Sequence, residues 1–323
     1  PLALAVDVGG SKILTALANS SGKIFSRDLR ITPAIEGPQA VINSVIASSK
    51  HTLAEAGATI AEIKVIGISI AGISDPKKGV VFSSPHLPGW HNVLLKRIME
   101  KELGKKTFLL NDANAAALGE LYFGAGRGTR NFIYITISTG IGGGIVINGE
   151  LYSGAFGMAG EVGHMTIDDA GPLCDCGNSG CWEALASGTA LTREARHRIN
   201  EGARTSILDY AGGEIEQVTA QVIHTAAKGG DALAQELIAQ TGYYLGVGLA
   251  NLINIFNPEL IVIGGGLANI GDRLLQPAFK VAGERALHEP YQKLRFAYAE
   301  LGQDSGVLGA AAFALQQVPR GVK

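Results

Sequence analysis

Apolar and polar positions fall into two patterns along this chain. Short apolar runs predict buried strands, as in LALAVDV at 2–8 and TFLLN at 107–111, whereas longer stretches with apolar residues near helical spacing predict helices, as at 37–57 and 230–256. Further strands are predicted at 13–18, 23–31, 64–72, 131–137, 145–152, 259–266 and 294–301, and further helices at 93–103, 113–124, 183–199, 218–228, 270–286 and 306–317. Strands alternating with helices predict an α/β fold with two domains facing a cleft.

Two stretches share one design: a buried strand, a turn of glycine and hydroxyl residues, and a strand that returns at once. The first turn is GGSK at 9–12, and the second is STGIGGG at 138–144. Rossmann and P-loop sites differ, because their glycine turn leads from a strand into a helix. We therefore expect another architecture, in which two glycine turns face one polyphosphate.

These turns have a functional and an ordinary interpretation. Glycine lets the backbone approach an anion closely, so the turn amides could converge on phosphate oxygens, and Asp7 could hold Mg²⁺ through water. Ordinary hairpins with a capping aspartate are the alternative. A third turn, VIGGGL at 262–267, could accept an adenosine or be a tight crossover. Asn111 and Asp112 open a predicted helix, where Asp112 is either an N-cap or a carboxylate that takes the proton of a sugar hydroxyl.

The chain's cysteines are confined to one loop. All three lie within eight residues and follow one histidine, in the order His164, Cys174, Cys176 and Cys181. One imidazole and three thiolates form the ligand set of a tetrahedral structural zinc. Buried free cysteines are the alternative, but CDCGNSGC is polar and rich in glycine. The metal would hold Glu161, Glu183 and the second nitrogen of His164 toward a ligand, and these groups suit sugar hydroxyls.

Composition restricts the class of protein. The 323 residues suffice for two domains, and 46% of them are hydrophobic, as in a compact protein. The net charge of −2 gives no electrostatic reason to expect nucleic acid or an anionic membrane as partner. The opening PLALAVDVGG lacks the basic segment and cleavage site of a signal peptide, and no apolar run approaches the roughly 18 residues of a membrane span. Three cysteines do not suggest a disulfide framework, so we expect a cytoplasmic protein.

Four motifs, DVGGSK, NDANAAALGE, TGIGGG and GEVGHMTIDDAGPLCDCGNSGCWEALASG, together resemble the ROK family (repressor, open reading frame, kinase). The resemblance implies a two-domain actin-like ATPase fold, hexokinase-type and ribonuclease H-like, with a structural zinc loop. From the order of its elements we expect a smaller α/β domain of 1–110, completed by the C-terminal helix 304–323, and a larger domain of 111–303 that carries the zinc loop. The resemblance further implies a homodimer or homotetramer that transfers the γ-phosphoryl group of ATP-Mg²⁺ to the 6-hydroxyl of a hexose, with glucose as the expected sugar.

The resemblance also implies residue roles. Asp112 would be the general base that removes the proton from the sugar 6-hydroxyl. The sugar would be bound by Gly72, Asn111, Asp112, Glu161, His164 and Glu183. ATP would be bound by Asp7, Gly9, Gly10, Ser11, Lys12, Thr139, Gly140, Gly142, Gly143, Gly264 and Gly265. The structural Zn²⁺ would be held by His164, Cys174, Cys176 and Cys181.

Departures from the family pattern keep other sugars open. His86 of SPHLPGW stands where glucokinase-like members typically have asparagine, and Ser138 and Ser11 stand where glycine and threonine are more usual. A Ser-Thr-Gly turn also occurs in the N-acetylmannosamine kinase branch, so kinases of N-acetylmannosamine, N-acetylglucosamine or fructose are alternatives. Glu161 and the GHMTID context favour the glucokinase branch.

Two alternatives come from other classes of protein. A non-catalytic sugar sensor on the same fold is disfavoured by the intact Asn111–Asp112 pair and by both phosphate turns. Because the first predicted strand starts at residue 2, we expect no DNA-binding segment. An ATP hydrolase or an acetate-kinase-like acyl phosphotransferase would leave the zinc loop and the sugar carboxylates unexplained.

Overall fold

The computed structural model describes residues 1–318, and contacts divide the chain into two units. Of the described residues, unit 1 comprises 1–134, 144–160 and 298–318, and unit 2 comprises 135–143 and 161–297. Residues 319–323, the end of the predicted C-terminal segment, lie outside the described residues. Among residues 1–318, no helix is both long and apolar enough to cross a membrane.

Unit 1 is built on a five-stranded sheet with the order β3-β2-β1-β4-β8. Its strands are β1 (Leu2–Val8), β2 (Lys12–Asn19), β3 (Ile24–Ile31), β4 (Ile63–Ile70) and β8 (Thr107–Asn111). Strands β1 and β2 pair antiparallel, with Val8 opposite Ile13, so the first glycine turn leads from strand to strand as predicted. Strands β1, β4 and β8 are parallel. Their carboxyl ends, at Val8, Ile70 and Asn111, therefore lie along one edge of the sheet.

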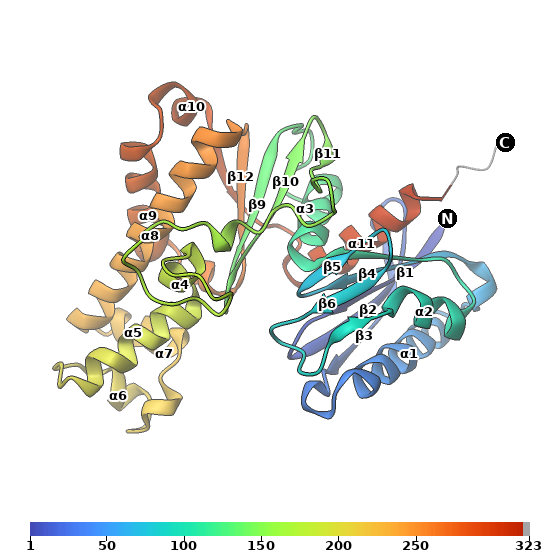
Figure 1. Ribbon diagram of the computed structural model, residues 1–323, viewed down its shortest axis with the longest axis horizontal. Helices are drawn as coiled ribbons and strands as arrows, with labels where there is room; N and C mark the ends of the chain where they lie inside the picture. The colour runs from blue at the N-terminus through green and yellow to red at the C-terminus, as the bar shows by residue number, and fades with distance from the viewer. Residues whose placement is uncertain (319–323) are drawn as a thin grey trace. The chain divides into compact units, whose positions relative to one another are not determined.

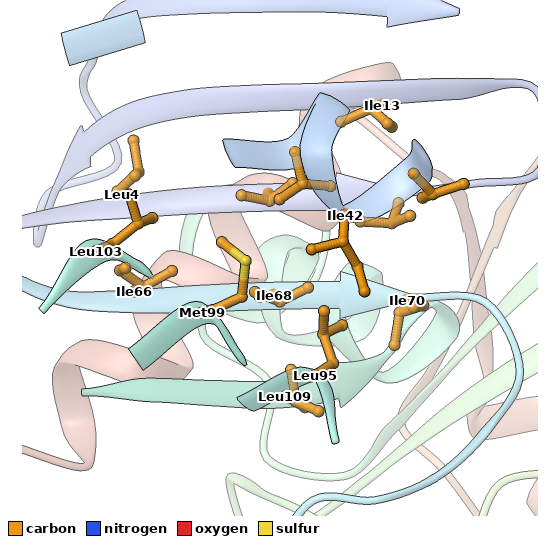
Figure 2. Packing of buried hydrophobic residues seen from close by; sticks show 14 of the residues in the cluster. Leu4, Ile13, Ile42, Ile66, Ile68, Ile70, Leu95, Met99, Leu103 and Leu109 are labelled. Atoms are coloured by element: carbon orange, nitrogen blue, oxygen red, sulfur yellow. The ribbon is translucent and has the colours of Figure 1, made fainter. Parts of the chain in front are cut away.

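Helices cover both faces of this sheet (Figure 1). On one face, α1 (Pro38–Glu55) and α2 (Leu95–Leu103) pack on large β-branched and aliphatic side chains, and Figure 2 shows Leu4, Ile68 and Met99 within this core. On the other face, alanines of β1 and β2 allow α11 (Ser305–Gln316) to approach closely. Burial of these apolar side chains supplies most of the favourable free energy of folding.

Helix α3 (Asp112–Phe123) packs directly on α11. A Cβ atom added at Gly309 would stand 2.8 Å from the backbone nitrogen of Gly119, so both helices need small residues at this crossing. By contacts, α3 groups with unit 1 for this reason. The domain boundary predicted at residue 111 stays a prediction.

A small antiparallel sheet with the order β5-β6-β7 was not predicted. It comprises β5 (Ile73–Asp75), β6 (Val80–Ser83) and β7 (His91–Val93), and its strands are too short to show a clear period in the sequence. The helix predicted at 93–103 therefore starts later, at Leu95. The segment 84–90 between β6 and β7 contains His86, which lies near Asp112 of the site described below.

The second sheet has the order β11-β10-β9-β12-β13. Its strands are β9 (Phe132–Ile137), β10 (Ile141–Ile147), β11 (Glu150–Leu151), β12 (Leu260–Gly264) and β13 (Arg295–Tyr298). The second glycine turn is shorter than predicted, because β10 already begins at Ile141 and includes three glycines. A Cβ atom at Gly144 would stand 2.8 Å from the Ala113 oxygen of α3, so close packing explains that glycine. The strand predicted at 145–152 breaks at Asn148 and Gly149, which both adopt positive φ, as in a tight hairpin turn.

The helices of unit 2 follow the predicted order, except that one predicted helix is divided and two short helices are added. They are α4 (Trp182–Ala186), α5 (Gly188–Asn200), α6 (Ile207–Tyr210), α7 (Ala220–Lys228), α8 (Ala232–Phe256), α9 (Asp272–Arg285) and α10 (His288–Lys293). The helix predicted at 183–199 is two helices, because Ser187 caps α5 by accepting a hydrogen bond from the Ala190 N–H. The short helices α6 and α10 were not predicted.

Candidate functional site

The first glycine turn closes β1 onto β2 and is tied down on both sides. The Gly9 N–H donates to the Lys12 oxygen at 3.0 Å, and the Thr32 hydroxyl donates to the Gly9 oxygen at 2.8 Å. The Thr32 N–H donates to the Ser11 oxygen, while the Lys12 ammonium reaches the Gln303 amide oxygen at 2.9 Å. The turn is therefore held by its own backbone and by Thr32.

Asp7 lies at the end of β1, just before this turn. The Ser69 hydroxyl on β4 donates to Asp7 Oδ1 at 2.6 Å. Burial raises the pKa of Asp7 to about 6, the hydrogen bond from Ser69 opposes this rise, and the negative charge of Asp112 adds to it. Asp7 and Asp112 are thus close enough to interact, although they lie more than a hundred residues apart in the sequence.

Asn111, not Asp112, is the N-cap of α3. Asn111 Oδ1 accepts hydrogen bonds from the N–H groups of Ala113 and Asn114, at 2.9 and 3.2 Å. Its amide nitrogen lies 3.5 Å from the oxygen of Gly72, whose positive φ of 121° favours glycine. The capping interpretation of Asp112 was wrong, because the preceding residue performs that task.

The Asp112 carboxylate stands at the first position of α3. Burial raises the pKa of Asp112, whereas a hydrogen bond from the Ala113 N–H and the nearby imidazole of His86 act in the opposite direction. A carboxylate with a raised pKa is a stronger base than an exposed one, which suits the removal of a proton from a hydroxyl. Unit 1 thus gathers Asp7, Gly72, Asn111 and Asp112 beside the carboxyl ends of the parallel strands.

The cysteine loop of unit 2 gathers its four predicted ligands. Their side-chain donor atoms all lie within 4.8 Å of one another, and they belong to His164, Cys174, Cys176 and Cys181. Backbone hydrogen bonds shape the loop, including Cys174 N–H to Asn178 at 2.8 Å and Trp182 N–H to Met165 at 2.8 Å. Trp182 anchors the loop because its indole N–H donates to the Tyr244 oxygen of α8 at 3.0 Å.

The spacing of these donor atoms fits a tetrahedral zinc ion. Cys176 Sγ lies 3.6 Å from Cys181 Sγ, and Cys174 Sγ lies 3.7 Å from His164 Nδ1. Zn–S bonds of about 2.3 Å in a tetrahedron place two sulfur atoms about 3.8 Å apart, whereas a disulfide would need about 2 Å. With Nδ1 on the cysteine side, His164 Nε2 can serve a ligand.

Ile141 connects the cysteine loop to the second glycine turn. The Ile141 N–H donates to Glu183 Oε2 at 2.8 Å. The Glu183 carboxylate also fills the space that a side chain at Gly140 would need. Glu161 is the N-cap of the single 3₁₀ turn Val162–His164, and His164 is the last residue of that turn. Glu161 is exposed, whereas Glu183 is partly buried.

A cavity of about 450 Å³ in unit 2 adjoins the second glycine turn. Its lining residues are Ser138, Thr139, Gly188, Thr189, Thr192, Arg193, Arg196, Thr219, Ala220, Gln221, Gly266, Leu267 and Ile270. The volume is that of a typical small-molecule site. Of the residues predicted to bind ATP, only Thr139 is among the lining residues. Gly264 ends β12 and Gly265, with φ of 90°, follows it, so both lie next to the lining residue Gly266.

The helix residues of this cavity were missed in the sequence. Arg196 donates to the oxygens of Glu216 and Val218, at 2.7 and 3.0 Å, which fixes the plane of its guanidinium. The N–H groups of Gly188 and Thr189 donate to the oxygens of Ser138 and Thr139, and so bind the start of α5 to the turn. The one available signal was Ser187 as an N-cap, which marks a helix start but not a ligand.

Known proteins resemble the chain over nearly its whole length. The model of the ROK family matches residues 3–317. A glucokinase from Thermotoga maritima is 35% identical, over 98% of each chain. A putative xylose repressor from Caldicellulosiruptor sp. is 34% identical, over 98% of this chain and 79% of the repressor. The crystal structure of a ROK family glucokinase from Streptomyces griseus, in complex with glucose and AMPPNP, matches with a TM-score of 0.85 at 34% identity, over 98% of this chain and all of that one.

Proposed function

The chain belongs to the ROK family, and we propose that it is an ATP-dependent hexose kinase that phosphorylates the 6-hydroxyl of glucose. The fold is the actin-like ATPase fold of ROK glucokinases, and sugar kinase is the activity that the glucokinase relatives support. Glucose as the substrate and the 6-hydroxyl as the acceptor are the finer parts of the proposal. The dimer or tetramer stays a prediction.

One observation supports the kinase chemistry above all others. Asn111 is the N-cap of α3, so Asp112 is not needed for that task, and its carboxylate accepts the Ala113 N–H through Oδ1 at 2.9 Å while it stands beside Asp7 and the first glycine turn. A kinase needs a carboxylate that accepts the hydroxyl proton close to a site that binds phosphate and Mg²⁺. Asp112 would take the proton of the 6-hydroxyl as the oxygen attacks the γ-phosphorus. Asp7 would hold Mg²⁺ through water, and the ion would neutralise charge on the phosphates.

The remaining residues have binding roles in this proposal. In unit 1, Asn111 and the backbone of Gly72 would contact the sugar, and residues 9–12 would contact the phosphates. In unit 2, Glu161, Glu183 and Nε2 of His164 would bind sugar hydroxyls. Zn²⁺ on the Cys3His cluster would fix the loop that holds these three groups, and the complete ligand shell gives it no part in the chemistry.

The cavity in unit 2 suits the nucleoside of ATP. Thr139 and Gly140 would contact phosphate, with Gly142 and Gly143 in the adjoining strand and Gly264 and Gly265 near the nucleoside. The fixed guanidinium of Arg196 offers a flat face on which a purine base can stack, and Gln221 offers an amide for its ring nitrogens.

A coupled assay of ADP release tests the proposal. The wild-type enzyme with ATP-Mg²⁺ is compared across glucose, mannose, fructose, N-acetylglucosamine and N-acetylmannosamine, with a sugar-free reaction as background. We expect glucose to give the highest kcat/KM. A higher kcat/KM for another sugar would correct the substrate. Binding of ATP and glucose without turnover of any sugar would favour a sugar sensor, the alternative raised by the xylose repressor relatives.

A further inference from the structure

His86 occupies the space above the first glycine turn. A Cβ atom added at Gly10 would stand 2.5 Å from His86 Cβ and 2.9 Å from the His86 oxygen. No side chain fits at position 10 without moving the His86 backbone. The absence of a side chain at Gly10 therefore lets the histidine lie directly on the turn proposed to bind phosphate.

The segment around His86 is anchored in the core of unit 1. The side chains of Leu87 and Trp90 are 1% exposed and belong to the cluster between the sheet and helices α1 and α2. The Trp90 N–H also donates to the Leu87 oxygen at 3.3 Å. His86 itself is exposed. A segment anchored through two buried side chains thus presents a solvent-accessible imidazole beside the turn, as a pre-positioned ligand contact requires.

His86 also interacts with the proposed catalytic carboxylate. Its imidazole is near enough to Asp112 to stabilise the ionised carboxylate, and Asp112 in turn affects Asp7. The titratable groups that interact at this end of the sheet include Asp7, Asp112, Lys12 and His86. His86 lies close both to the turn that would bind the donor phosphates and to the base that would act on the acceptor hydroxyl.

We propose that His86 contacts the γ-phosphoryl group of the nucleotide and donates a hydrogen bond to one of its oxygens during transfer. This inference rests on the proposed kinase function. The bond between the γ-phosphorus and the bridging oxygen of ATP breaks, a bond from the sugar oxygen to phosphorus forms, and the hydroxyl proton passes to Asp112. An imidazole N–H of His86 stabilises charge on the equatorial oxygens by donating a hydrogen bond, as donors at phosphoryl transfer sites do.

Nucleotide affinities isolate this contact, because ADP lacks the γ-phosphoryl group and AMPPNP has one. We would titrate wild type, His86→Ala, His86→Gln and the control His91→Ala with the Mg²⁺ complexes of both nucleotides in a calorimeter. His91 is an exposed histidine on the neighbouring strand β7. His86→Ala is expected to weaken AMPPNP binding about tenfold while ADP affinity changes less than about twofold, the size of one hydrogen bond to a charged group. His86→Gln, which keeps a donor, should lose less, and His91→Ala should lose nothing.

Three results would overturn the inference. An equal loss of ADP and AMPPNP affinity in His86→Ala would assign His86 to the shape of the turn. Unchanged affinities for both nucleotides, with an altered sugar preference, would assign it to the sugar. A ratio of AMPPNP affinity to ADP affinity that is the same in wild type and in His86→Ala would also exclude the contact. These results can be distinguished from failure of the kinase proposal. If that proposal is wrong, wild type does not phosphorylate any sugar, but the ratio of AMPPNP affinity to ADP affinity still tests whether His86 contacts the γ-phosphoryl group.

Discussion

The two glycine turns of this chain begin from the same sequence design and end with different surroundings. At the first turn, the missing side chain of Gly10 is replaced by His86, in a segment of unit 1 that the buried side chains of Leu87 and Trp90 anchor. At the second turn, the missing side chain of Gly140 is replaced by the carboxylate of Glu183, which follows the cysteine cluster. In both cases glycine makes room for a chemical group from a distant part of the chain.

This difference suggests a division of labour. The first turn lies beside Asp7 and Asp112, which suit Mg²⁺ binding and proton transfer, and a hydrophobic core supports it. The second turn lies beside Glu183 and the Cys3His cluster, which suit sugar binding, and a metal ion would support it. Changes near the first turn should therefore act mainly on kcat, and changes near the second should act mainly on sugar affinity.

Removal of the metal should produce the largest difference between the two turns, because it should affect sugar affinity and stability through the second turn only. In Cys181→Ser the zinc shell is incomplete, and we expect a loss of sugar affinity of about 10–100-fold with a fall in the melting temperature of more than about 10 °C, because structural zinc contributes folding free energy. The control is Asp175→Asn, an exposed residue of the same loop that is not a ligand. Glucose titration and thermal unfolding measure both effects. A metal-free protein with the affinity and melting temperature of wild type would exclude a role for zinc.

Alanine at the two turn glycines should produce different kinetic losses. Gly10→Ala must displace the backbone of His86, so we expect kcat to fall about 10–100-fold at nearly constant KM for sugar. Gly140→Ala displaces the flexible end of Glu183 and breaks its bond to Ile141, so KM for sugar should rise several-fold, KM for ATP should rise as well because Gly140 would contact phosphate, and kcat should change less. Steady-state kinetics distinguishes them. The division of labour is wrong if both variants change the same parameter to the same extent.

Asp7→Asn should raise stability while lowering activity, the smallest of these effects. Between the usual pKa of 3.8 and its folded value of about 6, Asp7 holds a proton in the folded state that the unfolded state has lost. Stability therefore falls as the pH rises through this range, and the cost above pH 6 is at most about 3 kcal/mol. The amide carries no charge and removes this cost. We expect a higher melting temperature for Asp7→Asn at pH 7 and little difference at pH 4, and equal gains at both pH values would contradict this account.

The sequence predicted those features that depend on local patterns. Buried apolar runs predicted β1, β4 and β8. The close spacing of Cys174, Cys176 and Cys181 after His164 predicted a metal site, and the structure brings these four donor atoms together. The three-stranded sheet β5-β6-β7 was not predicted, because strands of three or four residues are too short to show an alternation of apolar and polar residues. The break at Ser187 was missed because the apolar residues Ala190 and Leu191 resume soon after Ser187, Gly188 and Thr189.

The contacts that distinguish the two turns could not be predicted from the sequence. His86 lies 76 positions from Gly10, and Glu183 lies 43 positions from Gly140, so only the packed sheet and helices bring them together. The same is true of Arg196 and Gln221, which meet in one cavity from two helices. Asn111 as the cap of α3 was also hidden, because either residue of the Asn–Asp pair can cap a helix.

The most direct test of the central claim is the effect of Asp112→Asn on turnover and on glucose binding, measured on the same preparation. The account predicts that kcat falls about 10²–10⁴-fold, because the amide cannot accept the hydroxyl proton, while calorimetric glucose affinity stays within about threefold of wild type. Asn111→Ala serves as the comparison, because loss of the cap should lower stability as well as sugar affinity. Turnover of Asp112→Asn near the wild-type rate would contradict the assignment of the base and the division of labour between the two turns.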